Sequence, residues 1–88
     1  MRIKNGFVVR EIAGQHVVVA LGDAGKIFNG IIKLNETGRA IWDMLTVGAE
    51  REEIIEGLLE TYEVERSVVE RDCDTFLETL REKNILAE

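Results

Sequence analysis

A strand-like pattern of hydrophobic and polar residues changes into a helix-like pattern near the middle of the chain. Ile32 and Leu34 alternate with their neighbours, as on a strand with one buried face, and this leaves Ile31 and Lys33 on the other face. Asn35 is a favourable helix N-cap, and the apolar residues after it recur at three- and four-residue intervals. The pattern therefore predicts that a strand ends and a helix begins at Asn35.

Two apolar runs before this junction predict two more strands. Phe7 to Ile12 and His16 to Leu21 are rich in the β-branched and aromatic residues that suit a pleated sheet. Only Ala13 to Gln15 separate them, a short connection that is typical of an antiparallel hairpin. Met1 to Asn5 form a polar lead-in to the first strand.

The stretch from Gly22 to Asn29 connects the hairpin to the third strand and starts as a glycine-containing loop. Ile27 and Phe28 fit either this loop or the start of the third strand, which runs to about Leu34. The loop superficially resembles a phosphate-binding loop, but its glycines are too closely spaced and Ile27 stands where Ser or Thr is required. A flexible turn is the better interpretation.

Two further helices are expected after the first. Gly48 interrupts the helical pattern, and the apolar spacing then predicts helices from about Glu50 to Tyr62 and from about Ser67 to Asn84. Ile85 and Leu86 are expected to fold back against the core. The chain thus predicts an α+β fold in which a three-stranded antiparallel sheet is followed by three helices that cover one of its faces.

Composition and charge restrict the class of protein. The 88 residues, 45% hydrophobic and 32% charged, fit one folded domain spanning residues 1–88, and no linker-like segment divides it. The formal charge of -6 argues against nucleic acids and anionic membranes as partners. A single cysteine, together with the lack of a recognisable signal peptide or membrane-spanning run, favours the cytoplasm.

The sequence offers no constellation for catalysis, a cofactor or a metal ion. Its one histidine, His16, and its one cysteine, Cys73, are far apart in the chain. His16 begins a strand, which favours a structural or surface role, and Cys73 falls on an apolar helix stripe, which favours a small buried hydrophobe over a reactive thiol. The carboxylates are dispersed along helix surfaces. No enzyme activity is expected.

One segment resembles a known family. Residues 28–38, Phe-Asn-Gly-Ile-Ile-Lys-Leu-Asn-Glu-Thr-Gly, followed by Ile41 and Trp42, are similar to the signature segment of pyrroloquinoline-quinone biosynthesis protein D, the PqqD-like peptide chaperones. The upstream run Phe7 to Ile12 and the downstream residues Leu59, Tyr62 and Val64 also resemble that family's pattern, so the similarity covers nearly the whole chain.

The resemblance implies a winged helix-turn-helix-like fold that recognises the leader of a ribosomally synthesised precursor peptide. In that family the leader adds as a further strand to the edge of the third strand and lies in a groove against the third helix. It is then presented to a modifying enzyme, often a radical S-adenosylmethionine maturase that carries iron-sulfur clusters. The chain itself would contribute peptide binding and no chemistry.

Carried over by position, the resemblance gives two sets of candidate peptide-binding residues. The strand edge is Gly30, Ile31, Ile32, Lys33 and Leu34, and the groove wall on the last helix is Val68, Asp72, Thr75 and Phe76, with the flank that faces the peptide left open. Proline at Ile32 would remove a donor from the edge if that N–H faces outward.

Each candidate also has a structural interpretation. Ile32, Leu34 and Phe76 suit the core, Lys33 suits the protection of an edge strand against aggregation, and Gly30 suits a close backbone approach or a bulge.

Two other functions remain as alternatives. A winged-helix DNA-binding regulator would share the fold, but its recognition helix should be positive, and the last helix carries Glu70, Asp72, Asp74, Glu78 and Glu82 against Arg71, Arg81 and Lys83. A structural dimerisation module would use the same open strand edge to pair two copies of the chain as a homodimer.

Overall fold

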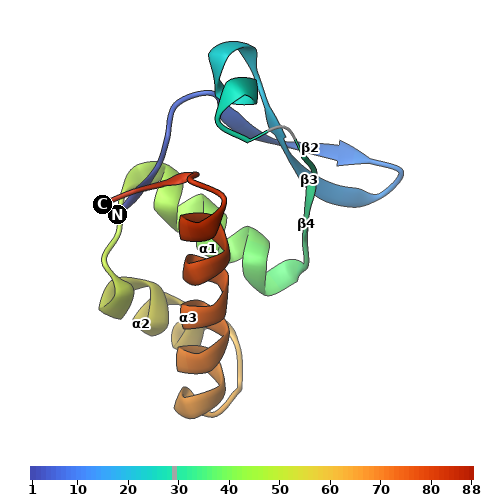
Figure 1. Cartoon of the computed structure of the whole chain (residues 1–88). Coiled ribbons are helices and arrows are strands. Elements are labelled where there is room, and N and C mark those ends of the chain that lie inside the picture. The colour runs from blue at the N-terminus through green and yellow to red at the C-terminus, as the bar shows by residue number, and fades with distance from the viewer. Residues whose placement is uncertain (29) are drawn as a thin grey trace.

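The computed structural model describes residues 1–28 and 30–88, so Asn29, expected at the end of the loop, lies outside the described residues. A three-stranded antiparallel sheet in the order β2-β3-β4 is followed by three helices, which confirms the predicted α+β fold (Figure 1). The elements in chain order are β1 (Arg2–Ile3), β2 (Phe7–Ile12), β3 (Gln15–Ala20), the 3-10 helix η1 (Gly22–Lys26), β4 (Ile32–Leu34), α1 (Glu36–Val47), α2 (Arg51–Thr61), α3 (Arg66–Glu82) and β5 (Leu86–Ala87).

The β2–β3 hairpin closes through a two-residue turn. Ile12 pairs directly with Gln15, and both Ala13 and Gly14 have positive φ angles of 52° and 77°. Two positive φ angles in succession match a type I′ turn, whose twist suits paired strands. The predicted three-residue connection was therefore one residue too long, because Gln15 already belongs to β3.

The strand before α1 is shorter than the sequence pattern allowed. β4 contains only Ile32–Leu34, while Ile27 and Phe28 follow η1 and lie outside the strand. A Cβ on Gly30 would lie 2.6 Å from Cζ of Phe28, so the absence of a side chain at Gly30 lets the aromatic ring approach the backbone. The close approach expected at Gly30 is thus confirmed, and a strand that starts at Ile27 is wrong.

The strand-to-helix junction at Asn35 is confirmed. Its side-chain Oδ1 accepts a hydrogen bond of 2.7 Å from the backbone N–H of Gly38, which is the geometry of an N-cap. α2 begins with a capping box, in which the side chains of Glu50 and Glu53 each accept from the other residue's backbone N–H. These caps fix where both helices begin.

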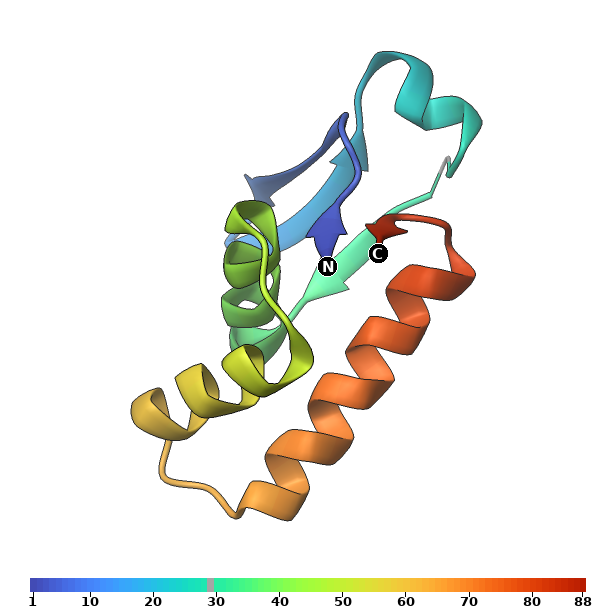
Figure 2. The ribbon, with the colours of Figure 1, turned by 90° about the vertical axis from the view of Figure 1, so that its left-hand side faces the viewer.

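Figure 2 shows α1 in front of the sheet, with α2 and α3 extending below it. Ile32 and Leu34 point from β4 into this core, each only 9% exposed. Cys73 on α3 is fully buried, and burial raises the pKa of its thiol to about 11, in agreement with its predicted role as a small hydrophobe. Trp42 of α1 is buried in the same core.

Residues from the two ends of the chain form a second, two-stranded sheet. Arg2 pairs with Ala87 and Ile3 with Leu86 in the β1–β5 ribbon. The polar lead-in expected at Met1 to Asn5 is therefore partly strand. The predicted return of Leu86 to the core is confirmed, since it is buried.

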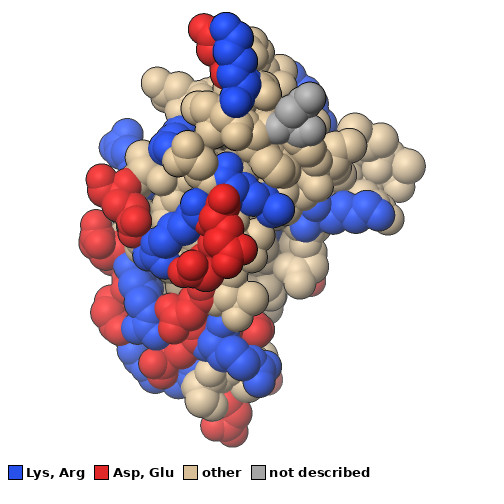
Figure 3. Space-filling view, viewed as in Figure 1, with Lys and Arg blue, Asp and Glu red and all other residues tan. Residues whose placement is uncertain are grey.

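α2 and α3 are joined by ion pairs on their exposed surfaces. Arg51 binds Asp74 through two hydrogen bonds, Nε to Oδ1 at 2.7 Å and Nη2 to Oδ2 at 2.9 Å. Arg66 donates to Glu52 at 2.7 Å and to Glu56 at 3.1 Å. Figure 3 shows acidic and basic side chains interleaved over the helical part of the molecule, so much of the negative charge is locally compensated.

The Arg51–Asp74 pair should make the stability of the folded protein depend on pH. The hydrogen bonds from Arg51 hold the pKa of the Asp74 carboxyl below its ordinary value. A carboxyl whose pKa is lower in the folded state contributes stability above its unfolded pKa of about 4, and this contribution is lost as the pH falls through the folded value. Arg51→Met should therefore reduce the difference in melting temperature between pH 7 and pH 3.

Arg71→Met is the matched control, because it removes the same charge from an exposed arginine whose nearest acidic group is Asp72 of its own helix, at 3.6 Å. If both variants show the same difference in melting temperature between the two pH values, the attribution to the Arg51–Asp74 pair is contradicted.

Candidate functional site

The direction of the backbone groups on β3 follows from one hydrogen bond and the strand register. The N–H of Leu21 donates to the carbonyl of Gly6 at 2.7 Å, across the end of the β2–β3 pair. Backbone groups of successive residues in an antiparallel pair point alternately toward the partner and away from it. The groups of Val17 therefore face β2, and those of His16 and Val18 face β4.

The same alternation shows which residue of β4 faces outward. Ile32 pairs with Val18 and Leu34 with His16, so both direct their N–H and C=O groups toward β3. Lys33 lies between them and directs its N–H and C=O away from β3, where the part of the chain that the structure describes places no further strand. Since the N–H of Ile32 faces β3, proline at that position would disrupt the sheet itself.

A groove runs between this strand edge and α3. Ile32 and Ile41 form a buried apolar floor, with the half-buried Phe76 beside them. Polar side chains of α3 form the rim. We call this the α3 groove; it encloses about 340 Å³ and is lined by Ile32, Lys33, Asn35, Thr37, Gly38, Ile41, Asp72, Thr75, Phe76 and Thr79.

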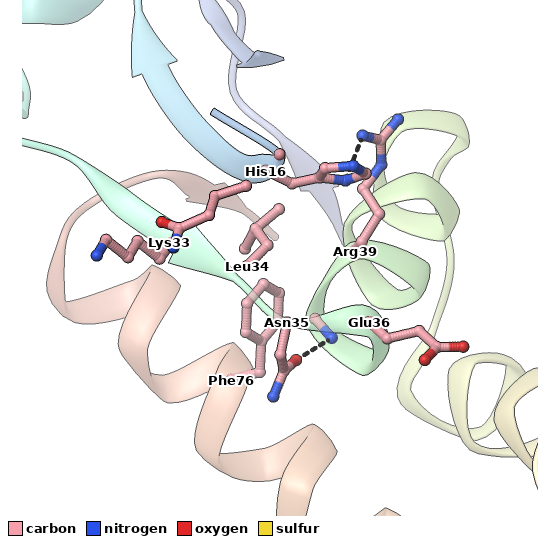
Figure 4. A pocket seen from close by; sticks show the side chains of 10 residues that line it. His16, Lys33, Leu34, Asn35, Glu36, Arg39 and Phe76 are labelled. Carbon is pink, nitrogen blue, oxygen red and sulfur yellow. Dashed lines mark hydrogen bonds between the residues drawn. The ribbon is translucent and has the colours of Figure 1, made fainter. Parts of the chain in front are cut away.

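A second hollow lies beside the groove, toward the tip of the β2–β3 hairpin (Figure 4). Leu34 and Phe76 give it an apolar side, and its far wall is polar because Nη1 of Arg39 lies 3.1 Å from Nδ1 of His16. Nε of Arg39 also donates to Asp43 at 2.9 Å. We call this the hairpin hollow; it encloses about 700 Å³ and is lined by Gly14, Gln15, His16, Lys33, Leu34, Asn35, Glu36, Gly38, Arg39 and Phe76.

The start of α1 brings the two hollows together. Lys33, Asn35, Gly38 and Phe76 line both of them. A Cβ on Gly38 would lie 3.1 Å from Oδ1 of Asn35 and 3.4 Å from Cε1 of Phe76, so the absence of a side chain there lets the cap and the aromatic ring approach the helix. This explains physically why glycine follows the Leu-Asn-Glu-Thr segment.

The structure brings most of the candidate residues together. Ile32 and Lys33 on β4 line the α3 groove together with Asp72, Thr75 and Phe76 on α3. The flank of α3 that lines this groove is the one that carries Asp72 and Thr75.

Three of the other candidates lie elsewhere, while Leu34 lines the hairpin hollow. Gly30 and Ile31 are exposed just before β4, and Ile31 is 68% accessible. Val68 lies near the α2–α3 connection, where it lines a shallow surface depression with residues 63–66.

Several groove residues were not singled out from the sequence. Thr79 lies one helical turn beyond Thr75, and its i+4 spacing was a usable signal once the facing flank was known. Thr37 and Ile41 line the groove from α1 because that helix begins directly after β4. His16 was assigned a structural or surface role; its side chain lines the hairpin hollow.

The site can bind an extended chain. An outward-facing strand edge can exchange main-chain hydrogen bonds with a polypeptide, and an adjacent apolar floor can accept its side chains. Within residues 1–28 and 30–88, no group of three or more His, Cys, Asp or Glu side chains is arranged to hold a metal ion. No helix in these described ranges is long and apolar enough to cross a membrane.

Comparison with known proteins finds one matching family and two similar solved structures. The family described as Coenzyme PQQ synthesis protein D (PqqD) matches residues 15–86 of the chain. The solved structure of TbiB1 in complex with the TbiA(beta) leader peptide is 30% identical, with a TM-score of 0.76 over 100% of both chains. Lasso peptide synthetase B1, complexed with the leader peptide, is 25% identical, with a TM-score of 0.75 over 99% of this chain and 96% of the other. No curated protein matches the chain.

Proposed function

Because the chain belongs to the PqqD family, we propose that it binds the leader segment of a ribosomally synthesised precursor peptide. The observation that carries this proposal is the outward-facing N–H and C=O of Lys33 beside the α3 groove. The two similar structures, TbiB1 and lasso peptide synthetase B1, are complexes with leader peptides, which supports the same class of ligand for this chain.

In the proposed complex, the leader is an added strand next to β4. Main-chain hydrogen bonds to Lys33 supply affinity that is independent of sequence, and side chains that enter the α3 groove supply specificity. The leader's backbone would also extend past Asn35, whose φ and ψ angles of -79° and -178° continue the extended conformation beyond β4. The peptide-binding residues proposed for this mode are Gly30, Ile31, Ile32, Lys33 and Leu34 on the strand side and Asp72, Thr75 and Phe76 on α3. Val68, which lines a different depression, is not among them.

The chain is proposed to act as a non-catalytic, single-domain adaptor. Peptide binding alone does not change the peptide, so a separate modifying enzyme has to act on the bound precursor. The resemblance to PqqD-like chaperones supports a radical S-adenosylmethionine maturase in that role. The complex is proposed to be cytoplasmic. Leader binding is the step that the geometry supports directly.

The two alternatives have less support. DNA binding through α3 would bring Glu70, Asp72 and Glu78 toward phosphates, which is unfavourable. Pairing of two β4 edges about a two-fold axis centred on Lys33 would place its two copies directly opposite each other, and like charges in such a pair are destabilising.

Calorimetric titration tests the proposal. The full chain is titrated with synthetic leader segments of precursor peptides whose genes lie beside its own, and with the TbiA(beta) leader peptide. Random duplex DNA serves as the control. We expect saturable binding of one leader with a Kd of about 1 µM or tighter, near -8 kcal/mol, and no heat from DNA. Binding of DNA but of no leader would overturn the proposal in favour of the regulator.

A further inference from the structure

Lys33 lies on the face of the sheet opposite the helices. Its neighbours Ile32 and Leu34 point toward the helices, so the side chain of Lys33 points to the other face of the sheet. Cross-strand register places Arg10, Val17 and Lys33 in one row on this face. Lys33 is the member of this row at the open edge.

One residue of this row is unusually buried for its position. Val17 is only 5% exposed although it lies outside the core cluster that contains Val18. The residues directly opposite Val17 on its two sides are Arg10 and Lys33, whose long aliphatic stems can cover a valine while their charged ends stay in water.

An added antiparallel strand would meet Lys33 in a defined way. The residue opposite Lys33 would exchange both main-chain hydrogen bonds with it, at a Cα separation of about 5.5 Å, and would place its side chain on the same face. The residues before and after it would point toward the helices, one opposite Ile32 at the α3 groove and the other opposite Leu34 at the hairpin hollow. The two hollows thus match the two-residue repeat of a strand.

We propose that Lys33 selects an acidic residue at the centre of the leader's recognition segment, with an apolar residue next to it in the α3 groove. The inference rests on the proposed function and adds the chemistry of the ligand. The central side chain meets a cation at the edge, and opposite charges across a strand pair attract. Protection of the edge against aggregation requires only a charge of either sign. A preference of Lys33 for acidic ligands would therefore distinguish ligand selection from edge protection.

The test is selection from a random 12-residue peptide display library with three proteins: the wild type, Lys33→Glu and Arg10→Glu. Wild type is expected to enrich peptides with Asp or Glu next to an apolar residue, and Lys33→Glu is expected to enrich Lys or Arg at the same place. Arg10→Glu makes the same change in net charge. Because Arg10 lies on β2, at the opposite side of the sheet from the β4 edge, this variant should keep the wild-type preference.

Affinities of one selected peptide quantify the effect. Exchange of its central acidic residue for lysine should weaken binding to the wild type about tenfold, and Lys33→Glu should reverse the order. Lys33→Gln, which keeps a polar side chain at the edge, should bind both peptides equally.

If Lys33→Glu selects the same central residue as the wild type, the inference is overturned while the proposed function stands. If the wild type selects no peptide at all, both are overturned.

Discussion

Lys33→Pro is expected to abolish leader binding while the protein remains folded. The N–H of Lys33 faces the open edge, so proline removes a donor that the sheet does not use, and proline is tolerated on an edge strand in that orientation. A lost hydrogen bond of about 1–3 kcal/mol, together with a ring that blocks the approach of the added strand, should weaken binding by about 100-fold or more. Fluorescence anisotropy of a labelled leader measures the affinity, and circular dichroism checks the fold.

Two other proline variants control this experiment. Glu11 pairs with His16 on β3, and the alternation directs its N–H away from β3 at the opposite edge of the sheet, so Glu11→Pro should leave leader binding unchanged. Ile32→Pro removes an N–H that faces β3, so it should lower stability. A folded Lys33→Pro protein that binds its leader with wild-type affinity would contradict strand addition at this edge.

Thr75→Trp should also reduce leader affinity strongly, by about 100-fold, through a different mechanism. Thr75 is exposed on α3 and lines the α3 groove, which encloses about 340 Å³. An indole at this position would occupy space that the leader's apolar side chain needs, and a fully buried apolar side chain contributes about 1.5–3 kcal/mol. Because Thr75 is exposed, its replacement leaves the core packing intact.

The matched control is Glu78→Trp, which adds the same ring to an exposed position further along α3 that does not line the groove. Titration of the same leader into both variants should show the loss in Thr75→Trp and wild-type affinity in Glu78→Trp. Equal affinities in the two variants would contradict the assignment of the groove.

Local sequence signals were sufficient for much of the fold. The alternation at Ile32 and Leu34 gave the buried face of β4, and Asn35 gave the start of α1, because both signals depend on residues close together in the chain. The β1–β5 ribbon could not be found in this way. Its strands have two residues each, too few to show a period of two, and its pairing joins Arg2 to Ala87.

The site was predictable in part. The apolar stripe of α3 placed Phe76 near the core, but which flank of the helix faces β4 depends on how the helix packs, and the sequence left that open. Val68 was included because it lies on the same side of α3 as Thr75, although it is almost two turns further from β4. The outward direction of the Lys33 backbone follows from the register of three strands. The Leu21–Gly6 hydrogen bond then shows which residues of β3 face β2.

The most direct test of strand addition is amide hydrogen exchange of β4, measured by NMR with and without a saturating leader peptide. In the free protein, the amides of Ile32 and Leu34 should exchange slowly because they face β3, and the amide of Lys33 should exchange rapidly. Bound leader is predicted to slow the exchange of the Lys33 amide selectively. Rapid exchange at Lys33 in the saturated complex would contradict the proposal that the leader binds as an added strand.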